Sequence, residues 1–316
     1  MIYDVHTHVG LDTGFFLRGW WPYAATAQDL LERMNNSKVD KAVCFPLAIS
    51  SAYDVPAFVK DGTVNLRSGA TPYENENRLL IQEVERIDTD RRLRVLAMFD
   101  PDREVAQQVE NLRPQVGQIT GLKLQATMIQ SHVAELLKGG RALMELAVEH
   151  ELPVLIHTSI HPKDHFSQAS DCLDVAESFP TVRFNLAHSL RFSIFNLKRA
   201  AQLPNVWIDC SAHLAHCALA AKNSPVIAAK EDRVDVDYTK PSKVLEATAA
   251  LLRKNQYMWG SDSPFMSWCD HNMKLVFSYQ QEVDALNALP QPLKTSMSQT
   301  AALLWLGKKE TVHPSL

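Results

Sequence analysis

The sequence lacks the features that mark secreted, membrane-spanning or nucleic-acid-binding proteins. It has only five cysteines among 316 residues, with no Cys-x-x-Cys spacing, so we expect free thiols in a reducing compartment. No apolar run approaches the roughly 18 residues of a membrane span. Positive charge is not in excess, because 32 Lys and Arg stand against 36 Asp and Glu. These absences remove the electrostatic case for nucleic acid or an anionic membrane as a partner.

The same composition predicts a cytoplasmic protein. The first strand is predicted to begin at Ile2, which leaves no room for a cleaved signal peptide. Hydrophobic residues make up 46% of the chain, enough for either one large α/β barrel or two ordinary domains. Trp20 and Trp21 would suit burial against a second subunit, so a homodimer is one expectation.

Segments with strand character alternate with segments of helical spacing. Strands are predicted within Met1–Gly10, Val39–Phe45, Arg92–Phe99, Thr120–Gln125, Pro153–His157, Val182–His188, Asn205–Asp209 and Tyr257–Asp262. Helices are predicted at Thr26–Met34, Tyr73–Ile87, Glu104–Leu112, Arg141–His150, Cys172–Ser178, Ile194–Ala201, Val244–Arg253, Lys274–Leu286 and Pro292–Leu306. With no repeat or linker, this alternation predicts an α/β protein, a single (β/α)8 TIM barrel formed by residues 1–316 as one domain.

The predicted loops differ in length at the two ends of the strands. Loops from a helix to the next strand are short, whereas several loops from a strand to the next helix are long: Val9–Ala25, Leu47–Pro72, Thr158–Asp171 and Ser211–Ser242. In (β/α)8 barrels the strand-to-helix loops build the active face. The functional site is therefore expected at the carboxyl ends of the strands.

The first strand carries a His-x-His pair. Because side chains alternate along a strand, Asp4, His6 and His8 are expected on one face. Two imidazoles on rigid backbone can converge on one divalent cation. Taken alone, the pair is equally well explained as two polar residues at a strand end.

Three later strands also end in a residue that can bind a metal. His157, His188 and Asp262 each close an apolar segment. Any one of them alone is more often a hydrogen-bonded residue at the edge of a core. Together with His6 and His8 they predict imidazoles and a carboxylate around an ion with an open position for water, as catalytic zinc requires.

In these motifs the chain resembles the amidohydrolase superfamily, in particular the amidohydrolase-related branch that contains aminocarboxymuconate semialdehyde decarboxylase-like enzymes. The resemblance covers essentially the whole chain and is carried by Asp4–His8, Gly121–Leu124, Leu155–Thr158, Leu186–His188 and Trp259–Pro264. It implies that His6, His8, His157 and Asp262 bind the metal, and that His188 binds it or stands outside as an acid/base. Ser298–Leu304 departs from the Gly-Asn-Ala-like helix start of that branch, which affects subgroup membership more than the metal site.

Two other families begin with the same opening motif. TatD-type nucleases place a glutamate near the end of the fourth strand, where this chain has Lys123. The polymerase-and-histidinol-phosphatase phosphoesterases use further metal ligands in a smaller, seven-stranded barrel. The lysine, the eight predicted strands and the Gly-Ser-Asp ending disfavour both families.

Lys123 has two interpretations. A carboxylated lysine at this strand bridges two metals in some members of the superfamily, whereas in the resembled branch it would neutralise charge or contact substrate. We therefore expect one Zn²⁺, with Mn²⁺ or another divalent ion as alternatives. Further substrate contacts are expected from Arg18, Trp20 and Arg191, because arginine grips a carboxylate through two hydrogen bonds. His213 and His216 are considered, but not predicted, as a second metal site.

The leading functional hypothesis is metal-dependent hydrolysis of a small amide, lactone or ester. The metal would acidify its water, Asp262 would take the proton, and the metal or His188 would polarise the carbonyl. The alternative is non-oxidative decarboxylation of an aromatic or unsaturated carboxylic acid at the same site. A barrel that binds ligand without turnover is the third class. An arginine beside the open metal position would favour the decarboxylase, and a spacious neutral pocket the hydrolase.

Overall fold

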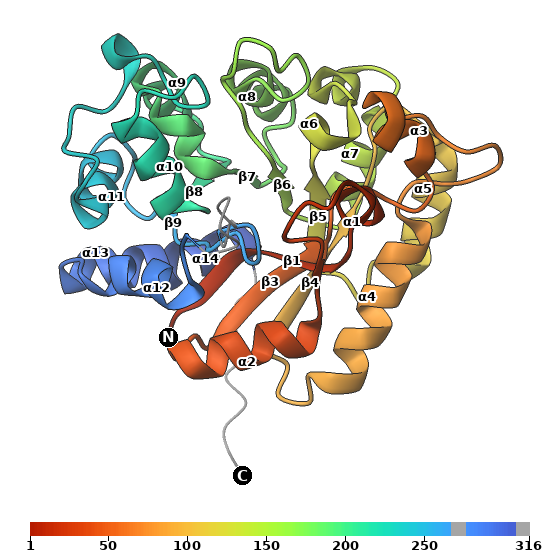
Figure 1. Cartoon of the computed structure of the whole chain (residues 1–316), viewed down its shortest axis with the longest axis horizontal. Coiled ribbons are helices and arrows are strands. Elements are labelled where there is room, and N and C mark those ends of the chain that lie inside the picture. The colour runs from red at the N-terminus through yellow and green to blue at the C-terminus, as the bar shows by residue number, and fades with distance from the viewer. Residues whose placement is uncertain (267–275, 308–316) are drawn as a thin grey trace.

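The computed structural model describes residues 1–266 and 276–307, and its strands form one sheet (Figure 1). The strands are β1 (Tyr3–Leu11), β2 (Ala24–Ala25), β3 (Lys41–Pro46), β4 (Leu93–Met98), β5 (Gly121–Leu124), β6 (Val154–Ile156), β7 (Phe184–Leu186), β8 (Val206–Asp209) and β9 (Tyr257–Met258). Their order in the sheet is β2-β1-β3-β4-β5-β6-β7-β8-β9. All neighbours are parallel except the short β2, which pairs antiparallel with β1. Each of the eight strands expected from the sequence is present, and the α/β class is confirmed.

Backbone hydrogen bonds also connect the first strand to the segment that follows the last. Val5 N–H donates to the carbonyl of Trp259 at 3.2 Å, and Asp262 N–H donates to the carbonyl of His6 at 2.9 Å. A parallel bridge pairs Thr7 with Ser263. The sheet therefore curls until its two ends meet, which is consistent with a TIM barrel and brings the first strand beside the segment that follows the last strand.

Helices lie outside the curled sheet (Figure 1). They are α1 (Thr13–Arg18), α2 (Ala27–Ser37), α3 (Val55–Asp61), α4 (Glu74–Ile87), α5 (Val105–Leu112), α6 (Ala126–Ile129), α7 (Arg141–Glu149), α8 (Ala169–Ser178), α9 (Ile194–Ala200), α10 (His213–Ala221), α11 (Pro241–Ala249), α12 (Tyr279–Asn287), α13 (Gln291–Thr295) and α14 (Ala301–Leu306). Short 3₁₀ turns occur at Arg113–Gln115, Val133–Leu137, His188–Phe192 and Lys230–Asp232. Thr26 caps α2 as the sequence predicts, since its side chain accepts from Asp29 N–H and Asp29 accepts from Thr26 N–H.

Three helices lie in segments that the sequence indicated only as long loops: α1, α3 and α10. The first two are short and depend on local caps, because the Asp12 and Asp54 side chains accept the hydrogen bonds that begin them. Six of the nine residues of α10 are buried, so it has no polar face to give helical periodicity. The predicted helix Pro292–Leu306 is divided into α13, a π turn at Ser296–Thr300, and α14. Of the predicted helix Lys274–Leu286, residues 274 and 275 lie outside the described residues.

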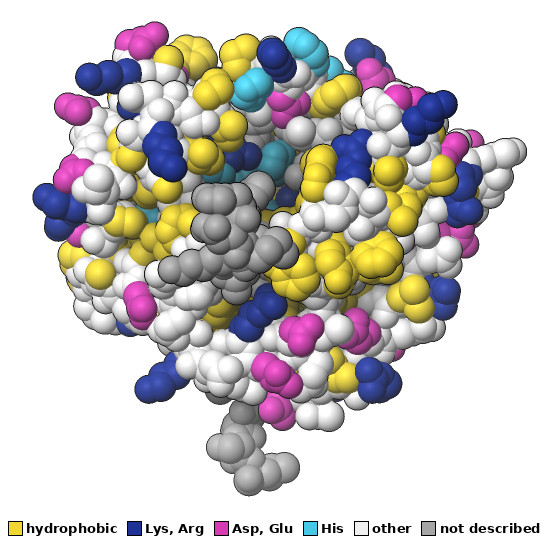
Figure 2. Space-filling model, in the orientation of Figure 1, with side chains coloured by type: hydrophobic (Ala, Val, Ile, Leu, Met, Phe, Trp, Pro, Cys, Tyr) yellow, Lys and Arg dark blue, Asp and Glu magenta, His cyan; other side chains and the backbone are white. Residues whose placement is uncertain are grey.

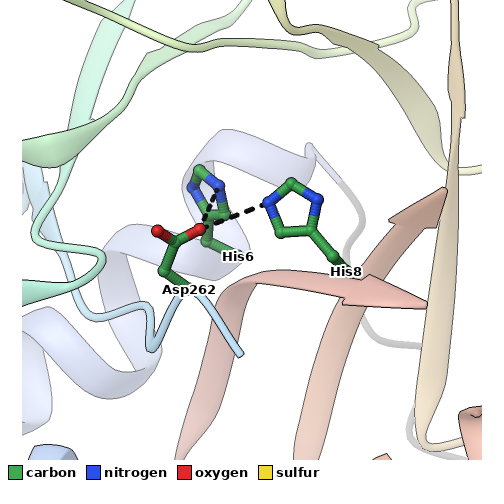
Figure 3. Close-up of side chains that lie close together, drawn as sticks. All are labelled: His6, His8 and Asp262. Carbon is green, nitrogen blue, oxygen red and sulfur yellow. Dashed lines mark ion pairs between the residues drawn. The ribbon is translucent and has the colours of Figure 1, made fainter. Parts of the chain in front are cut away.

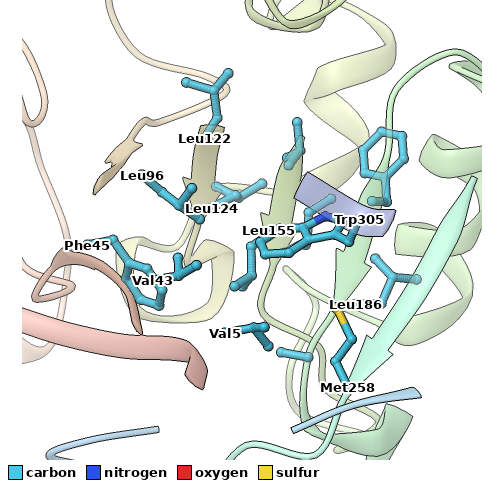
Figure 4. Close-up of a cluster of buried hydrophobic side chains, with 14 of the residues drawn as sticks. Val5, Val43, Phe45, Leu96, Leu122, Leu124, Leu155, Leu186, Met258 and Trp305 are labelled. Atoms are coloured by element: carbon cyan, nitrogen blue, oxygen red, sulfur yellow. The ribbon is translucent and has the colours of Figure 1, made fainter. Parts of the chain in front are cut away.

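Apolar side chains from neighbouring strands and the last helix form the core (Figure 4). Val5, Leu124, Leu155 and Leu186 are fully buried within the sheet, and Trp305 of α14 packs with them. The four described cysteines are buried and free. No helix in the described ranges is long and apolar enough to cross a membrane. This apolar core lies directly beside the carboxyl ends of the strands, where the polar side chains of the expected site are found.

Gly260 lies where the segment after β9 passes β1, and it leaves no room for a side chain. A Cβ atom there would lie 2.9 Å from Cβ of His6. We expect Gly260→Ala to lower the free energy of unfolding by about 1–3 kcal/mol, the range for forced overpacking. Urea denaturation measures this. Gly117→Ala is the matched control, because a Cβ there has no atom within 4 Å, and equal stability losses in the two variants would contradict the prediction.

Candidate metal centre

The two ends of the sheet bring two histidines and one aspartate together (Figure 3). His6 and His8 project from β1, and Asp262 follows β9. Nε2 of each imidazole lies 3.2 Å from the same Asp262 oxygen, Oδ1. One potential ligand atom from each residue lies within 4.8 Å of the others, and this is the one such group of three among the described residues. Two side chains from the first strand and one from residue 262 thus converge on one point.

The proton on His6 is placed by a second carboxylate. Nδ1 of His6 lies 2.9 Å from Oδ2 of the fully buried Asp209. Burial favours a raised pKa for Asp209, but its contacts with His6, His188 and Ser211 outweigh burial and lower that pKa. An ionised carboxylate only accepts, so His6 donates from Nδ1. The lone pair on Nε2 then faces Asp262.

Two electron-pair donors that face each other at 3.2 Å require a cation between them. Nε2 of His6 is buried and makes no hydrogen bond to any residue in the ranges 1–266 and 276–307. Burial and Lys123 lower the pKa of His6, whereas Asp209 and Asp262 raise it and outweigh them. The carboxylates therefore stabilise a positive charge here, either a second proton or a metal ion.

The position of His8 favours the metal ion. Burial lowers the pKa of His8 to about 4, so the ring is neutral near pH 7 and can donate its lone pair to a metal. Nε2 of His8 faces the same Asp262 oxygen as Nε2 of His6, so a single ion could bind all three atoms. Ligand atoms about 2.0–2.2 Å from a tetrahedral ion lie about 3.3–3.5 Å apart, close to the 3.2 Å observed. The residues present fit a divalent ion held by two imidazoles and one carboxylate.

His157 lies outside this group, although it was expected to be the fourth ligand. Its Nδ1 lies 2.9 Å from Nε2 of His188, and its Nε2 lies 3.3 Å from Nη2 of Arg191. A guanidinium only donates, so Nε2 of His157 accepts and Nδ1 carries the proton that is given to His188. Burial, followed by the charge of Arg191, lowers the pKa of both histidines. His157 and His188 are therefore a neutral, hydrogen-bonded pair beside the three converging residues.

An unusual backbone presents His188 and Arg191 to the site. The φ angles of all five residues in His188–Phe192 are positive, between 46° and 64°. Hydrogen bonds hold the start of this run, because Asp209 accepts from His188 N–H at 3.1 Å and the carbonyl of Ser211 lies 3.1 Å from Nδ1 of His188. Arg191 is buried and contacts His157 and His216. Such a left-handed run is costly for residues other than glycine and is typical of functional sites.

Lys123 lies on β5 as a buried cation without a hydrogen-bond partner in the described part of the chain. Its Nζ is 4.8 Å from the centre of the Phe45 ring, and the same ring contacts His6 and His8. Burial lowers the pKa of Lys123 to about 7. An unpaired amine beside the metal centre is suited to an anionic group that arrives from outside.

Arg18 ends α1, Trp20 follows two residues later, and the guanidinium of Arg18 reaches α3 rather than the histidines of the site. Arg18 donates to the carbonyl of Phe58, and its guanidinium lies 4.1 Å from the Phe58 ring and 4.7 Å from the Trp20 ring. These contacts join α1 to α3, and Trp20 keeps 46% of its surface exposed. His213 and His216 contact Pro241 and Arg191, respectively, and belong to no metal-binding group among residues 1–266 and 276–307.

Asp209 is the residue of this centre that sequence reasoning missed. It ends a predicted strand, as His157, His188 and Asp262 do, so the strand-end rule that found them would also have selected it. Figure 2, in the orientation of Figure 1, shows histidine and basic side chains within a hollow of the molecule. Of the residues selected from the sequence, His6, His8 and Asp262 lie together, whereas His157 and His188 pair with each other beside them.

Comparison with known proteins identifies the family of the chain and several solved structures with a similar fold. A family model described as Amidohydrolase matches residues 3–284. No curated protein sequence matches the chain.

Among solved structures, one similar fold is a candidate 2-pyrone-4,6-dicarboxylic acid hydrolase from Pseudomonas putida, with 18% identity, 97% of each chain covered and a TM-score of 0.61. A Burkholderia multivorans amidohydrolase with bound zinc has 12% identity, coverage of 97% of this chain and 99% of that chain, and a TM-score of 0.61. A 5-carboxyvanillate decarboxylase from Novosphingobium aromaticivorans, complexed with manganese, has 13% identity, 97% and 96% coverage and a TM-score of 0.60. At these identities the likeness is one of fold.

Proposed function

Because the chain is an enzyme of the amidohydrolase family, we propose that it is a metal-dependent hydrolase of a small amide, lactone or ester. The observation that carries the proposal is the convergence of His6 and His8 on one oxygen of Asp262. We also propose that its parallel strands form one (β/α)8 barrel and that residues 1–316 act as a single domain.

His6, His8 and Asp262 would hold the divalent ion. Such an ion supplies acidification of water and polarisation of a carbonyl when it is bound. Asp262 would accept the proton of the attacking water, since its contacts with His6 and His8 overcome burial and lower its pKa, which keeps the carboxylate ionised. That proton would then pass from Asp262 to Nε2 of the neutral His188, which accepts from His157 in this structure, and from His188 to the leaving group. Lys123 and Arg191 would bind an anionic part of the substrate.

The purified protein should contain about one divalent ion per chain, zinc or manganese, with His6, His8 and Asp262 as its ligands. Two imidazoles and a carboxylate leave a position open for water, as catalytic zinc sites do. Elemental analysis of protein loaded with each metal and then desalted measures the content. Protein that neither carries nor takes up a divalent ion would exclude this function, and an occupancy of two would favour a carboxylated Lys123.

His157 can be tested as a fourth ligand in the same assay. If it joins the ion, His157→Ala should lose metal as His8→Ala does. If it only pairs with His188 and Arg191, as in the structure, metal content should persist while activity falls.

Arg191 supports a second candidate, non-oxidative decarboxylation of a small aromatic or unsaturated carboxylic acid. Its guanidinium is buried beside His157, and burial lowers its pKa only to about 10, so it remains charged at neutral pH. A buried arginine that contacts no carboxylate of the described residues can bind the carboxylate of a substrate.

One screen separates the two reactions. Metal-loaded protein is incubated with lactone, amide, ester and aromatic-acid libraries, and released acid and released CO₂ are followed separately. Acid without CO₂ establishes the hydrolase, and CO₂ release establishes the decarboxylase. Asp262→Asn protein is the control for background catalysis by free metal.

A further inference from the structure

Asp209 is a buried carboxylate, and each of its two oxygens accepts more than one hydrogen bond. Oδ2 accepts from Nδ1 of His6 at 2.9 Å and from Nδ2 of Asn185 at 2.8 Å. Oδ1 accepts from the backbone N–H of His188 at 3.1 Å, from Ser211 N–H at 2.9 Å and from Ser211 Oγ at 2.6 Å. With five donors on two oxygens, the carboxylate has one orientation available.

We infer that Asp209 is a positioning residue that couples the metal ligand His6 to the acid/base residue His188. This inference rests on the proposed metal-dependent function. Asp209 ends β8, so its position is set by the sheet and not by a loop. From there it contacts a residue of β1 on one side and the turn after β7 on the other.

On the His6 side, the carboxylate determines which nitrogen is free for the metal. It holds the proton on Nδ1 and directs the lone pair of Nε2 toward Asp262. A carboxylate behind a metal-binding imidazole fixes the ring and increases its basicity, and its loss lowers metal affinity or activity by about 10–100-fold.

On the His188 side, Asp209 fixes both the backbone and the ring. It accepts the N–H of the first residue of the left-handed run, and it orients Ser211. The hydroxyl and the carbonyl of Ser211 lie 2.9 and 3.1 Å from Nδ1 of His188. One carboxylate therefore sets the orientation of both imidazoles, and a change in it disturbs both at once.

The test is Asp209→Asn, which keeps the size of the side chain but replaces one acceptor oxygen by a donor. In either orientation the amide removes the negative charge behind His6, and it also places a donor against His6 or against the His188–Ser211 side. Competition with a chelator of known affinity gives the dissociation constants for Zn²⁺ and Mn²⁺. We expect them to rise by about 10–100-fold.

Asp100→Asn is the matched control. Asp100 is also fully buried and accepts from Tyr53, Arg103 and Ser131 at 2.8, 2.7 and 2.5 Å, but it contacts none of the metal-binding residues. Its metal affinity should equal that of the wild type. Ser211→Ala separates the two sides of Asp209, because it should lower turnover at saturating metal and leave the metal affinity unchanged.

A measurement on the unaltered protein keeps the inference testable if Asp209→Asn fails to fold. Nitrogen-15 histidine NMR of the zinc-loaded wild type should show His6 protonated on Nδ1, with His6→Asn used for assignment. Zinc affinity unchanged in folded Asp209→Asn, or a proton on Nε2 of His6, would overturn the inference alone. Wild-type protein that binds neither zinc nor manganese would overturn the proposed function and, with it, the inference.

Discussion

Asp262→Asn should lower turnover by about two to four orders of magnitude, the contribution expected of a general base. The Asp262 carboxylate contacts both His6 and His8, so water that binds at this site would lie next to a proton acceptor. Asparagine keeps the shape of the side chain but cannot accept that proton. The comparison uses kcat/KM at matched metal occupancy, because the substitution also removes an anionic ligand.

Asp88→Asn is the control for the loss of a buried carboxylate elsewhere in the barrel. Asp88 accepts from the backbone of Arg92 and Leu93 before β4 begins, at the opposite end of the strands from the metal centre. It should cost stability without a change in kcat. If Asp262→Asn with metal in place retains a near-normal rate, another group must be the base.

His188→Ala should reduce turnover by a similar factor, about 10²–10⁴, while metal content stays near the wild-type value. His188 contacts His157 and Ser211, and it is not among the three residues that converge on the cation position. His8→Ala is the contrasting variant, because it removes a proposed ligand and should empty the site. Metal analysis together with one active substrate measures both effects.

The pH dependence of the rate is a second test of the acid/base role of His188. Burial and then Arg191 lower its pKa well below the usual 6.5, so the ring is neutral at pH 7. Activity that needs the neutral ring should therefore fall only as the pH drops below 6.5, and this acid limb should be absent in His188→Ala. If His188→Ala empties the site as completely as His8→Ala does, His188 is a ligand and the acid/base must be sought elsewhere.

The strands and the His-x-His pair could be predicted because their signals are local. Alternation along β1 places His6 and His8 together, and an apolar segment that ends in His or Asp marks the edge of the sheet where parallel strands finish. The helices α1 and α10 had no such signal, since one depends on a single cap and the other is buried on most sides.

The contacts within the centre depend on distances that strand-end positions do not contain. His157 occupies the expected strand end, yet its ring pairs with His188 and Arg191. That pairing depends on the left-handed run after β7. The amino-acid sequence of this run does not indicate five consecutive positive φ angles, because none of its residues is glycine. Asp209 could have been found, but its role is visible only from the five donors around it.

The junction between β1 and the segment after β9 has a consequence for how the protein matures. Two of the proposed ligands lie within the first 8 residues, and the third is residue 262. During synthesis, the complete ligand set cannot exist until most of the chain has emerged, and this pairing of distant segments is a slow type of contact to form. A metal that binds only the assembled site stabilises the finished barrel by mass action. Metal supply would therefore influence the yield of folded protein as well as its activity. The ion would bind only after β1 has paired with the segment after β9, and it would then stabilise that pairing.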